Sequence, residues 1–264
     1  MIDIHSHILP GLDDGSKSLE ETLEIVRQLQ KAGFETILTT PHVIEGTDYL
    51  HPDEILASVE QVRQAVIESG IPVQILPGAE NYIFPEMAKW VREGKLLTLG
   101  NTKRYILVEL PLMEIPRYTD QVFFDLNVEG LTPVLAHPER YREIIAEPER
   151  LIEWAKRGIL FQIDFRSLSG RYGPQVKKLT ERMLSSGLIH FIGSDAHRVS
   201  HSESDAETLQ SLRQIIGEEK FEEVTVRNPQ CILEGKEIRV NEEYVLKNVD
   251  IKKKKRGISR FFKI

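Results

Sequence analysis

Cysteine is nearly absent from this sequence, in which Cys231 is the single thiol among 264 residues. One cysteine excludes a disulfide within the chain, so a reducing compartment is the default expectation. Long apolar runs are absent as well, and none approaches the roughly 18 residues that a membrane span needs. The first residues, from Met1 to His5, contain neither the basic nor the apolar region of an export signal. These absences predict a soluble cytoplasmic protein.

A surplus of positive charge is also missing. The chain has 34 Lys and Arg residues against 41 Asp and Glu residues, a net charge of −7. Proteins that bind nucleic acids normally have a basic face, so no nucleic-acid partner is expected. The oligomeric state is not fixed by any of these features.

The last 17 residues differ in character from the rest. Residues 248–264 contain seven Lys and Arg residues against Asp250 alone. We therefore predict one domain over residues 1–247 and a basic C-terminal tail over residues 248–264. Such a run is typically a solvated tail. The alternative is a weak contact of residues 252–263 with an anionic membrane, with Phe261 and Phe262 entering the interface. That contact would place the protein peripherally at the inner face of the membrane.

Helical and strand-like segments alternate along residues 1–247. Hydrophobic residues make up 41% of the chain and charged residues 28%, a balance typical of globular proteins. Apolar stripes at helical spacing occur within residues 19–29, 55–66, 176–183 and 209–216, and Ser18 with Glu21 resembles a capping box. Short runs rich in branched residues lie between the stripes, at 37–38, 73–76, 106–108, 134–136, 159–163 and 191–192. This alternation predicts parallel strands that are buried on both faces. After residue 216 we expect a closing helix, with a turn at Asn228 and Pro229.

Each predicted strand is followed by a potential metal ligand. These residues recur every 27 to 38 positions, about the length of one strand–helix–strand unit; in order they are His5 and His7, His42, Glu80, Glu109, His137, Asp164, and Asp195 with His197. In a closed barrel the carboxyl ends of all strands converge on one face, whereas an open sheet spreads them along an edge. The pattern therefore favours a distorted (β/α)7 barrel of the TIM type.

Two short motifs point to bound metal. In His5-Ser6-His7 the imidazoles lie at positions i and i+2 of a strand and point the same way, and Asp195-Ala196-His197 repeats this spacing. A lone HxH motif is weak evidence, but five of the eight histidines lie at predicted strand ends. Imidazoles mixed with carboxylates suit manganese, iron or zinc. Five histidines with Asp14, Glu80, Glu109 and Asp195 are too many for one ion, which predicts several divalent cations and a phosphoester substrate.

These motifs together resemble a known group of proteins. Asp3-x-His5-x-His7, Thr39-Thr40-Pro41-His42, Gly78-Ala79-Glu80, His137-Pro138-Glu139-Arg140 and Gly193-Ser194-Asp195-Ala196-His197 are similar to the motifs of the PHP (polymerase and histidinol phosphatase) superfamily. Within it, the Asp13-Asp14-Gly15 loop, Glu109 and the His-Pro-Glu-Arg string resemble the bacterial tyrosine-protein phosphatases of capsule and exopolysaccharide operons. The resemblance covers residues 3 to about 230 and implies a (β/α)7 barrel with a trinuclear centre.

The resemblance also implies a ligand set. One ion would bind His5, His7, Glu80 and Asp195; a second would bind Glu80 as a bridge, Glu109 and His137; a third would bind Asp14, His42 and His197. Manganese is the leading metal, with iron or zinc as alternatives. Asp13 competes with Asp14, because spacing does not separate adjacent acids.

Candidate catalytic residues are Arg140, Arg198 and His42. Arg140 matches the arginine of the His-Pro-Glu-Arg motif, which binds phosphate in the family. A second family arginine has no clean counterpart, and Arg198 is the available replacement. Asp3 and Asp164 are candidates for orienting ligands, although each can equally begin a strand or cap a turn. The C-x5-R loop of cysteine-dependent tyrosine phosphatases is absent, since position 237 is Glu237.

The implied function is hydrolysis of phosphotyrosine by a metal-activated hydroxide. The implied substrate is the tyrosine-rich tail of a bacterial tyrosine kinase that controls polysaccharide export. The alternatives are a small-molecule phosphatase of the histidinol-phosphate type and a non-catalytic module that binds the kinase tail. A metal-dependent DNase is less favoured, because the acidic body offers no track for a phosphate backbone.

Overall fold

The computed structural model describes residues 1–46, 49–199 and 205–238. The predicted tail, residues 248–264, lies outside the described residues. Within the described part, helices alternate with parallel strands. The strands are β1 (Ile2–Asp3), β2 (Thr36–Thr39), β3 (His42–Val43), β4 (Gln74–Pro77), β5 (Glu80–Tyr82), β6 (Tyr105–Glu109), β7 (Thr132–Ala136), β8 (Leu160–Asp164) and β9 (Phe191–Gly193).

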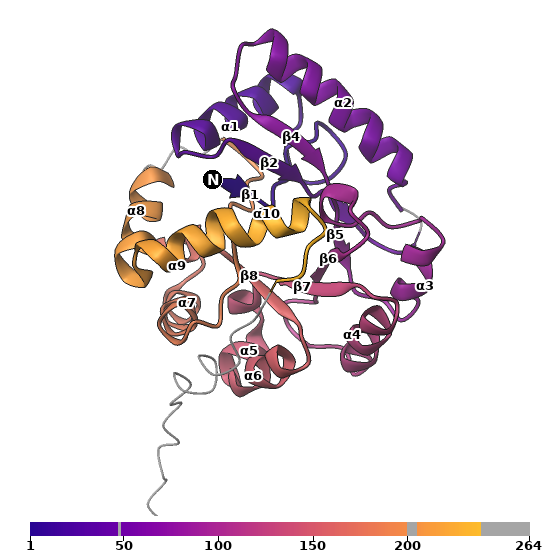
Figure 1. Ribbon diagram of the computed structural model, residues 1–264, viewed down its shortest axis with the longest axis vertical. Helices are drawn as coiled ribbons and strands as arrows, with labels where there is room; N and C mark the ends of the chain where they lie inside the picture. The colour runs from indigo at the N-terminus through magenta and orange to yellow at the C-terminus, as the bar shows by residue number, and fades with distance from the viewer. Residues whose placement is uncertain (47–48, 200–204, 239–264) are drawn as a thin grey trace, which may run out of the picture.

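Helices follow most of the strands and pack around them (Figure 1). The longer helices are α1 (Leu19–Lys31), α2 (Pro52–Glu68), α4 (Thr119–Val128), α6 (Glu149–Lys156), α7 (Pro174–Ser186) and α8 (Asp205–Ile216). Shorter helices are α3 (Met87–Arg92), α5 (Arg142–Ala146), α9 (Glu218–Glu222) and α10 (Asn228–Leu233). Short 3₁₀ segments are η1 (Leu99–Asn101), η2 (Pro138–Arg140) and η3 (Phe165–Ser169), and η4 (Glu223–Arg227) is a π-helical turn. Among the described residues no helix has the length and apolar character to cross a membrane.

The strands form two parallel sheets that curl toward each other. One sheet has the order β1-β2-β4 and the other β3-β5-β6-β7-β8-β9. Two residues separate β2 from β3, and two separate β4 from β5. Beyond β9, a parallel bridge pairs Ser6 with Ala196, and the backbone N–H of His7 donates to the carbonyl of Ala196 over 3.0 Å. The last strand segment thus contacts the first. The prediction of parallel, buried strands in a TIM-like arrangement is confirmed, with nine strands in the described residues where seven were expected.

Two apolar cores hold this arrangement. The outer core lies between the sheets and the surrounding helices, and it includes the buried face of α1, formed by Ile25, Val26 and Leu29. The inner core is enclosed by the strands themselves; its members are Ile2, Ile4, Leu38, Leu99, Tyr105, Leu107, Val134, Ala136, Leu160, Phe191 and Ile232. Ile232 belongs to α10, which lies across the amino ends of the strands (Figure 1). The amino end is therefore closed, and the opposite end carries the polar residues.

Of two local predictions, the helix cap at Ser18 is confirmed and the turn at Asn228 and Pro229 is not. Ser18 caps α1 as predicted, since its Oγ accepts from the backbone N–H of Glu21 over 3.3 Å. The Glu21 side chain accepts from the N–H of Lys17 instead of closing the box on Ser18. The turn at Asn228 and Pro229 was wrong. Helix continues through these residues, because the π-helical turn η4 leads directly into α10 and both Arg227 and Asn228 have helical backbone angles.

His190 gives the fold a predictable sensitivity to acid. It is buried just before β9, and its Nδ1 accepts from the N–H of Phe161 over 3.0 Å. Burial lowers the pKa of His190 to about 3, below the value of about 6.5 expected in an unfolded chain. The neutral form therefore stabilises the fold. The contribution of neutral His190 to the free energy of unfolding is present above about pH 6.5. It decreases by about 2 kcal/mol between pH 6.5 and 5, and it continues to decrease as the pH falls toward 3.

His190→Asn is expected to lose that share of the acid sensitivity, because an amide oxygen can accept the same hydrogen bond without titrating. The measurement is urea unfolding of the metal-free protein at about pH 7.5 and about pH 5. The free energy of unfolding of the wild type should fall further than that of the variant. Equal losses in the two proteins would contradict the assignment.

Candidate metal centre

The nine predicted metal ligands converge at the carboxyl ends of the strands. His5, His7 and Asp14 follow β1, His137 follows β7, and Asp195 and His197 follow β9, whereas His42, Glu80 and Glu109 lie in β3, β5 and β6. The register of the second sheet places His42 directly beside Glu80. The potential ligand atoms of eight of these residues form three overlapping groups, which leave out His137: His5, His7, Glu80 and Asp195; His42, Glu80 and Glu109; and His7, Asp14, His42 and His197.

The first group is the most compact. His5 Nε2 and His7 Nε2 lie 3.1 Å apart. Glu80 Oε2 lies 3.1 Å from His5 Nε2 and 3.2 Å from His7 Nε2. Asp195 Oδ1 lies 3.3 and 3.2 Å from the same two nitrogens. Ligands bound to one ion at about 2.0–2.2 Å stand about 3.0–3.6 Å from each other, so these four side chains match the ligand shell of a single cation.

The second group shares Glu80 with the first. His42 Nδ1 lies 3.1 Å from Glu80 Oε2 and 3.4 Å from Glu109 Oε2. His137 Nε2 approaches the other oxygen, Glu80 Oε1, at 2.9 Å, and lies 3.9 Å from Glu109 Oε1. His137 therefore lies beside Glu80, but the group that contains Glu80 and Glu109 is completed by His42 and not by His137.

The third group is more exposed. Asp14 Oδ1 lies 3.3 Å from His197 Nε2 and 3.5 Å from His42 Nε2. The side chain of Asp14 is 69% exposed, whereas those of His42 and His197 are 21% and 27% exposed. His7 belongs to this group as well as to the first. The groups thus share His7, His42 and Glu80, which places any ions that they bind next to one another.

Hydrogen bonds on the far side of three of the rings turn these imidazoles toward the centre. His5 Nδ1 donates to Gln162 Oε1 over 2.8 Å, and His7 Nδ1 donates to Asp13 Oδ2 over 2.7 Å. His197 Nδ1 donates to the carbonyl of Asp195 over 2.9 Å. Each bond leaves Nε2 as the atom that carries a lone pair toward the cluster.

The same contacts separate the two adjacent acids. Asp13 Oδ2 accepts from His7 Nδ1 and from the N–H of His42 over 3.0 Å, and Oδ1 accepts from the N–H of Gly15 over 2.8 Å. Both oxygens of Asp13 therefore bind protein groups, whereas Asp14 faces the histidine pair.

Acids and imidazoles at the centre shift each other's pKa strongly. Burial opposes protonation of His5, but the carboxylates of Glu80 and Asp195 raise its pKa to about 9. Burial likewise opposes ionisation of Glu80 and Asp195. The imidazole of His5 nevertheless holds the pKa of Glu80 well below its usual range, and the Arg140 guanidinium does the same for Asp195. A cation that binds here must replace protons on the imidazoles, so metal affinity should fall with falling pH.

Two backbone conformations at the centre are strained. His137 and Asp195 have φ values of 31° and 46°, in the left-handed region that non-glycine residues rarely occupy. Strain of this kind persists where the surroundings fix it and is concentrated at functional sites. Nearby, Gly15 packs against His7 so closely that a Cβ on Gly15 would lie 2.1 Å from the His7 carbonyl oxygen.

The two candidate arginines differ in their contacts. Arg140 Nη2 donates to Asp195 Oδ2 beside the first group, and the side chain is 16% exposed. Arg198 Nη1 donates to the carbonyl of Gly15 and lies 3.4 Å from Glu21 Oε2, with the side chain 40% exposed. Arg140 thus contacts a predicted metal ligand, whereas Arg198 contacts the loop that carries Asp14.

The candidate orienting acids, Asp3 and Asp164, bind backbone groups. Asp3 Oδ1 accepts from the N–H groups of His5 and Ser194, which ties β1 to the end of β9. Burial raises the pKa of Asp3 to about 6. Asp164 Oδ1 accepts from the N–H of Arg166 over 2.8 Å and caps η3. Neither side chain has a hydrogen bond to a ligand side chain among the described residues.

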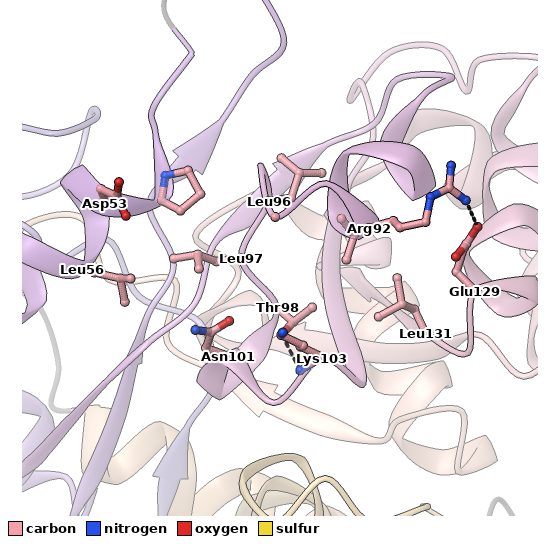
Figure 2. A pocket seen from close by; sticks show the side chains of 13 residues that line it. Asp53, Leu56, Arg92, Leu96, Leu97, Thr98, Asn101, Lys103, Glu129 and Leu131 are labelled. Atoms are coloured by element: carbon pink, nitrogen blue, oxygen red, sulfur yellow. Dashed lines mark hydrogen bonds and ion pairs between the residues drawn. The ribbon is translucent and has the colours of Figure 1, made fainter.

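A separate pocket lies away from the predicted ligands. It has a volume of about 450 Å³ and is lined by the first turn of α2, the end of α3, the segment that leads into β6, and Leu131 before β7. Figure 2 shows Leu97 and Leu131 facing it and the ion pair between Arg92 and Glu129 on one side. None of the nine candidate ligands lines this pocket.

Buried polar atoms without hydrogen-bond partners indicate whether divalent cations fit the centre. Glu80 Oε2, Asp195 Oδ1, His42 Nδ1 and His137 Nδ1 are buried and lack a hydrogen-bond partner. Unpaired polar atoms at the centre of a cluster of acids and imidazoles are costly unless a ligand satisfies them. Three of these atoms belong to the ligand groups above, and the mixed N and O donors suit manganese, iron or zinc. The residues fit divalent cations.

Comparison with known families decides where the chain belongs. A family model described as "Capsular polysaccharide synthesis, CpsB/CapC" matches residues 1–234. The chain belongs to the CpsB/CapC family. The tyrosine-protein phosphatase YwqE of Bacillus subtilis is 35% identical over 99% of this chain and 100% of its own length. The tyrosine-protein phosphatase CpsB of Streptococcus agalactiae serotype III is 30% identical over 89% of this chain and 99% of its own.

Solved structures extend the comparison to the fold. A chain from the crystal structures of YwqE from Bacillus subtilis and CpsB from Streptococcus pneumoniae, described as metal-dependent tyrosine phosphatases, matches with a TM-score of 0.86 and 36% identity. The match covers 92% of this chain and 98% of that chain. Histidinol phosphate phosphatase from Lactococcus lactis matches with a TM-score of 0.54 at 16% identity, over 82% of this chain and 93% of its own, a likeness of fold. This CpsB/CapC protein therefore belongs to a family of metal-dependent tyrosine phosphatases, as the motifs implied.

Proposed function

We propose that this protein hydrolyses the phosphomonoester of phosphotyrosine with the help of divalent cations. The observation that carries the proposal is the sharing of Glu80, whose Oε2 lies 3.1 Å from both His5 Nε2 and His42 Nδ1. Shared ligands support adjacent cations, which together can stabilise the attacking and leaving oxygens of an in-line displacement. The names of the relatives, tyrosine-protein phosphatases, support the substrate class.

The proposed substrate is the tyrosine-rich tail of a bacterial tyrosine kinase involved in capsule or exopolysaccharide synthesis. The family description, capsular polysaccharide synthesis, supports that setting. A cytoplasmic location fits such a partner. The basic tail would add a weak contact with anionic lipid at the inner face of the membrane.

We infer three cations per chain, with manganese as the leading candidate. The first would be held by His5, His7, Glu80 and Asp195. The second would be held by Glu80, Glu109 and His137, and the third by Asp14, His42 and His197. Asp14 is preferred to Asp13, because both oxygens of Asp13 already accept hydrogen bonds.

The proposed fold is a closed (β/α)7 barrel made of the two sheets. If β2 with β3 and β4 with β5 are each counted as one interrupted strand, the nine strands become seven in parallel order. The bridge between Ser6 and Ala196 would then close the ring. Closure would explain why ligands from six of these seven strands meet at one end.

Several of the protein's own side chains would assist the reaction. Bound cations supply a hydroxide near neutral pH and neutralise phosphate charge. Burial works against the charge of Arg140, but Asp195 and Asp164 raise its pKa, so this guanidinium stays cationic and can neutralise a phosphate oxygen. Gln162 and Asp13 keep His5 and His7 in the tautomer that presents Nε2. Arg198, which donates to the carbonyl of Gly15, would supply a second positively charged side chain for the phosphate.

A comparison of two substrates tests this function. With manganese present, the wild type is expected to release phosphate from a phosphotyrosyl peptide faster than from histidinol phosphate, and His5→Ala should release it from neither. Faster turnover of histidinol phosphate would favour a small-molecule phosphatase and contradict the proposal. Binding of the peptide without phosphate release at saturating manganese would indicate a non-catalytic module and would contradict it equally.

A further inference from the structure

A tight turn between two glycines places Tyr172 against Arg140. Gly170 and Gly173 have φ values of 83° and 96°, and the N–H of Gly173 donates to the carbonyl of Gly170 over 2.9 Å. Positive φ values of this kind favour glycine. The turn joins η3 to α7, and the Tyr172 ring centroid lies 4.7 Å from Arg140 Cζ. This distance is within the range of a cation–π contact.

The position of Tyr172 is itself fixed by a chain of hydrogen bonds. Its hydroxyl donates to Asp164 Oδ2 over 2.7 Å, and the other oxygen of Asp164 accepts from the N–H of Arg166. The Arg166 side chain makes two hydrogen bonds with Asp205, of 2.9 and 2.6 Å, and a third with the carbonyl of Ser194. Paired bonds of this type hold a side chain in one geometry. The ring of Tyr172 therefore rests on a buried, charged framework that joins β8, η3 and α8.

Two contacts therefore hold the guanidinium of Arg140, and one of its nitrogens, Nη1, stays available for a further hydrogen bond. Nη2 donates to Asp195 Oδ2, and the flat guanidinium lies by the Tyr172 ring. Nη1 donates no hydrogen bond to any residue that the structure describes, and Nε is buried without a partner. Asp195 belongs to the most compact ligand group. The free Nη1 therefore remains for an anion bound beside that group.

We propose that Tyr172 is a positioning residue that holds Arg140 in the orientation needed to bind the phosphate of the substrate. This inference rests on the proposed function and names a residue outside the metal-ligand motifs. Tyr172 acts through its ring on Arg140, and its hydroxyl acts on the ring through Asp164. Since an arginine side chain has several rotatable bonds, fixing it beforehand reduces the entropy lost when phosphate binds.

The test uses inorganic phosphate as the probe and the full-length, manganese-loaded protein. Tyr172→Leu removes the ring and is expected to weaken phosphate binding by about tenfold in titration calorimetry. Tyr172→Phe keeps the ring and is expected to change binding by no more than about threefold. In an Arg140→Ala background, Tyr172→Leu is expected to have no further effect, because a residue that acts only through Arg140 has nothing left to position.

A merely structural role predicts a different pattern. Tyr172→Leu would then weaken binding by the same factor with or without Arg140, which would overturn the proposal, as would unchanged binding in the single variant. Wild-type protein that does not bind phosphate would also overturn it. Metal content and melting temperature are measured alongside, and Tyr172→Met, which fills more of the same volume, replaces any Leu variant that loses its metals. Absence of peptide turnover in the wild type would sink the proposed function, whereas the binding cycle still decides the role of Tyr172.

Discussion

Replacing Glu80 with glutamine is expected to lower kcat/KM for an aryl phosphate by more than about a hundredfold. Loss of a partner outside the ligand shell typically costs 10- to 100-fold in metal affinity or activity, and Glu80 is itself a candidate ligand that belongs to two of the three groups. Its Oε2 contacts His5, His7 and His42, and its Oε1 contacts His137. An amide is similar in size but neutral, so the substitution removes the buried negative charge with little change in packing.

Metal analysis of the same preparations separates loss of ions from loss of fold. Glu80→Gln should contain fewer divalent cations per chain than the wild type while it unfolds cooperatively. Glu114→Gln is the matched control, because Glu114 is exposed in the loop that follows β6. Full activity and an unchanged metal content in Glu80→Gln would remove Glu80 from the ligand set.

Gly15→Ala adds one methyl group and is expected to disrupt the metal centre by displacing the backbone beside His7. The Cβ of Gly15→Ala would lie 2.1 Å from the carbonyl oxygen of His7 and 2.6 Å from its Cβ. Both neighbours belong to the segment that carries His7, so relief of the clash must move that segment or the loop with Asp13 and Asp14. Overpacking at this level costs about 3 kcal/mol, which would lower the melting temperature by about 6–10 °C in a chain of this size.

A second glycine of the same loop provides the comparison. Gly11 has a φ of 73° and no atom within 4 Å of a Cβ built on it. Gly11→Ala should therefore lose only about 1 kcal/mol from backbone strain and should keep its metals and its turnover. Calorimetric melting and metal analysis of both variants measure the difference. If Gly15→Ala has the same melting temperature as Gly11→Ala and retains full activity, the close packing beside His7 is not required.

The clustering of these acids and imidazoles could be predicted because strand ends are a strong constraint. Residues that follow buried parallel strands share one end of the sheet, so ligands far apart in the chain, such as His5 and Asp195, could be placed together from spacing alone. The resemblance to known motifs added Arg140 as a residue that binds phosphate. Spacing did not separate Asp13 from Asp14, since their difference depends on which carboxylate the His7 ring reaches.

Other residues had weak signals or none. Gln162 is a polar side chain inside the apolar run of β8, a pattern that could have identified it as a partner of a ligand. Tyr172 lies in an irregular turn, and its contact with Arg140 depends on the path of that turn, which no periodicity encodes. The helical continuation through Pro229 was missed because an Asn-Pro pair is typical of a turn, and no sequence signal marked the π-helical turn η4 that precedes it.

The most direct test follows metal and turnover in a single preparation. Purified full-length protein is analysed for metals and assayed on a phosphotyrosyl peptide before chelation, after chelation, and after manganese is restored. More than one divalent cation per chain, turnover that disappears with the metal, and turnover that returns with manganese are the predicted results. Turnover that persists in protein shown to be free of metal would contradict the assignment of these acids and imidazoles as a metal centre.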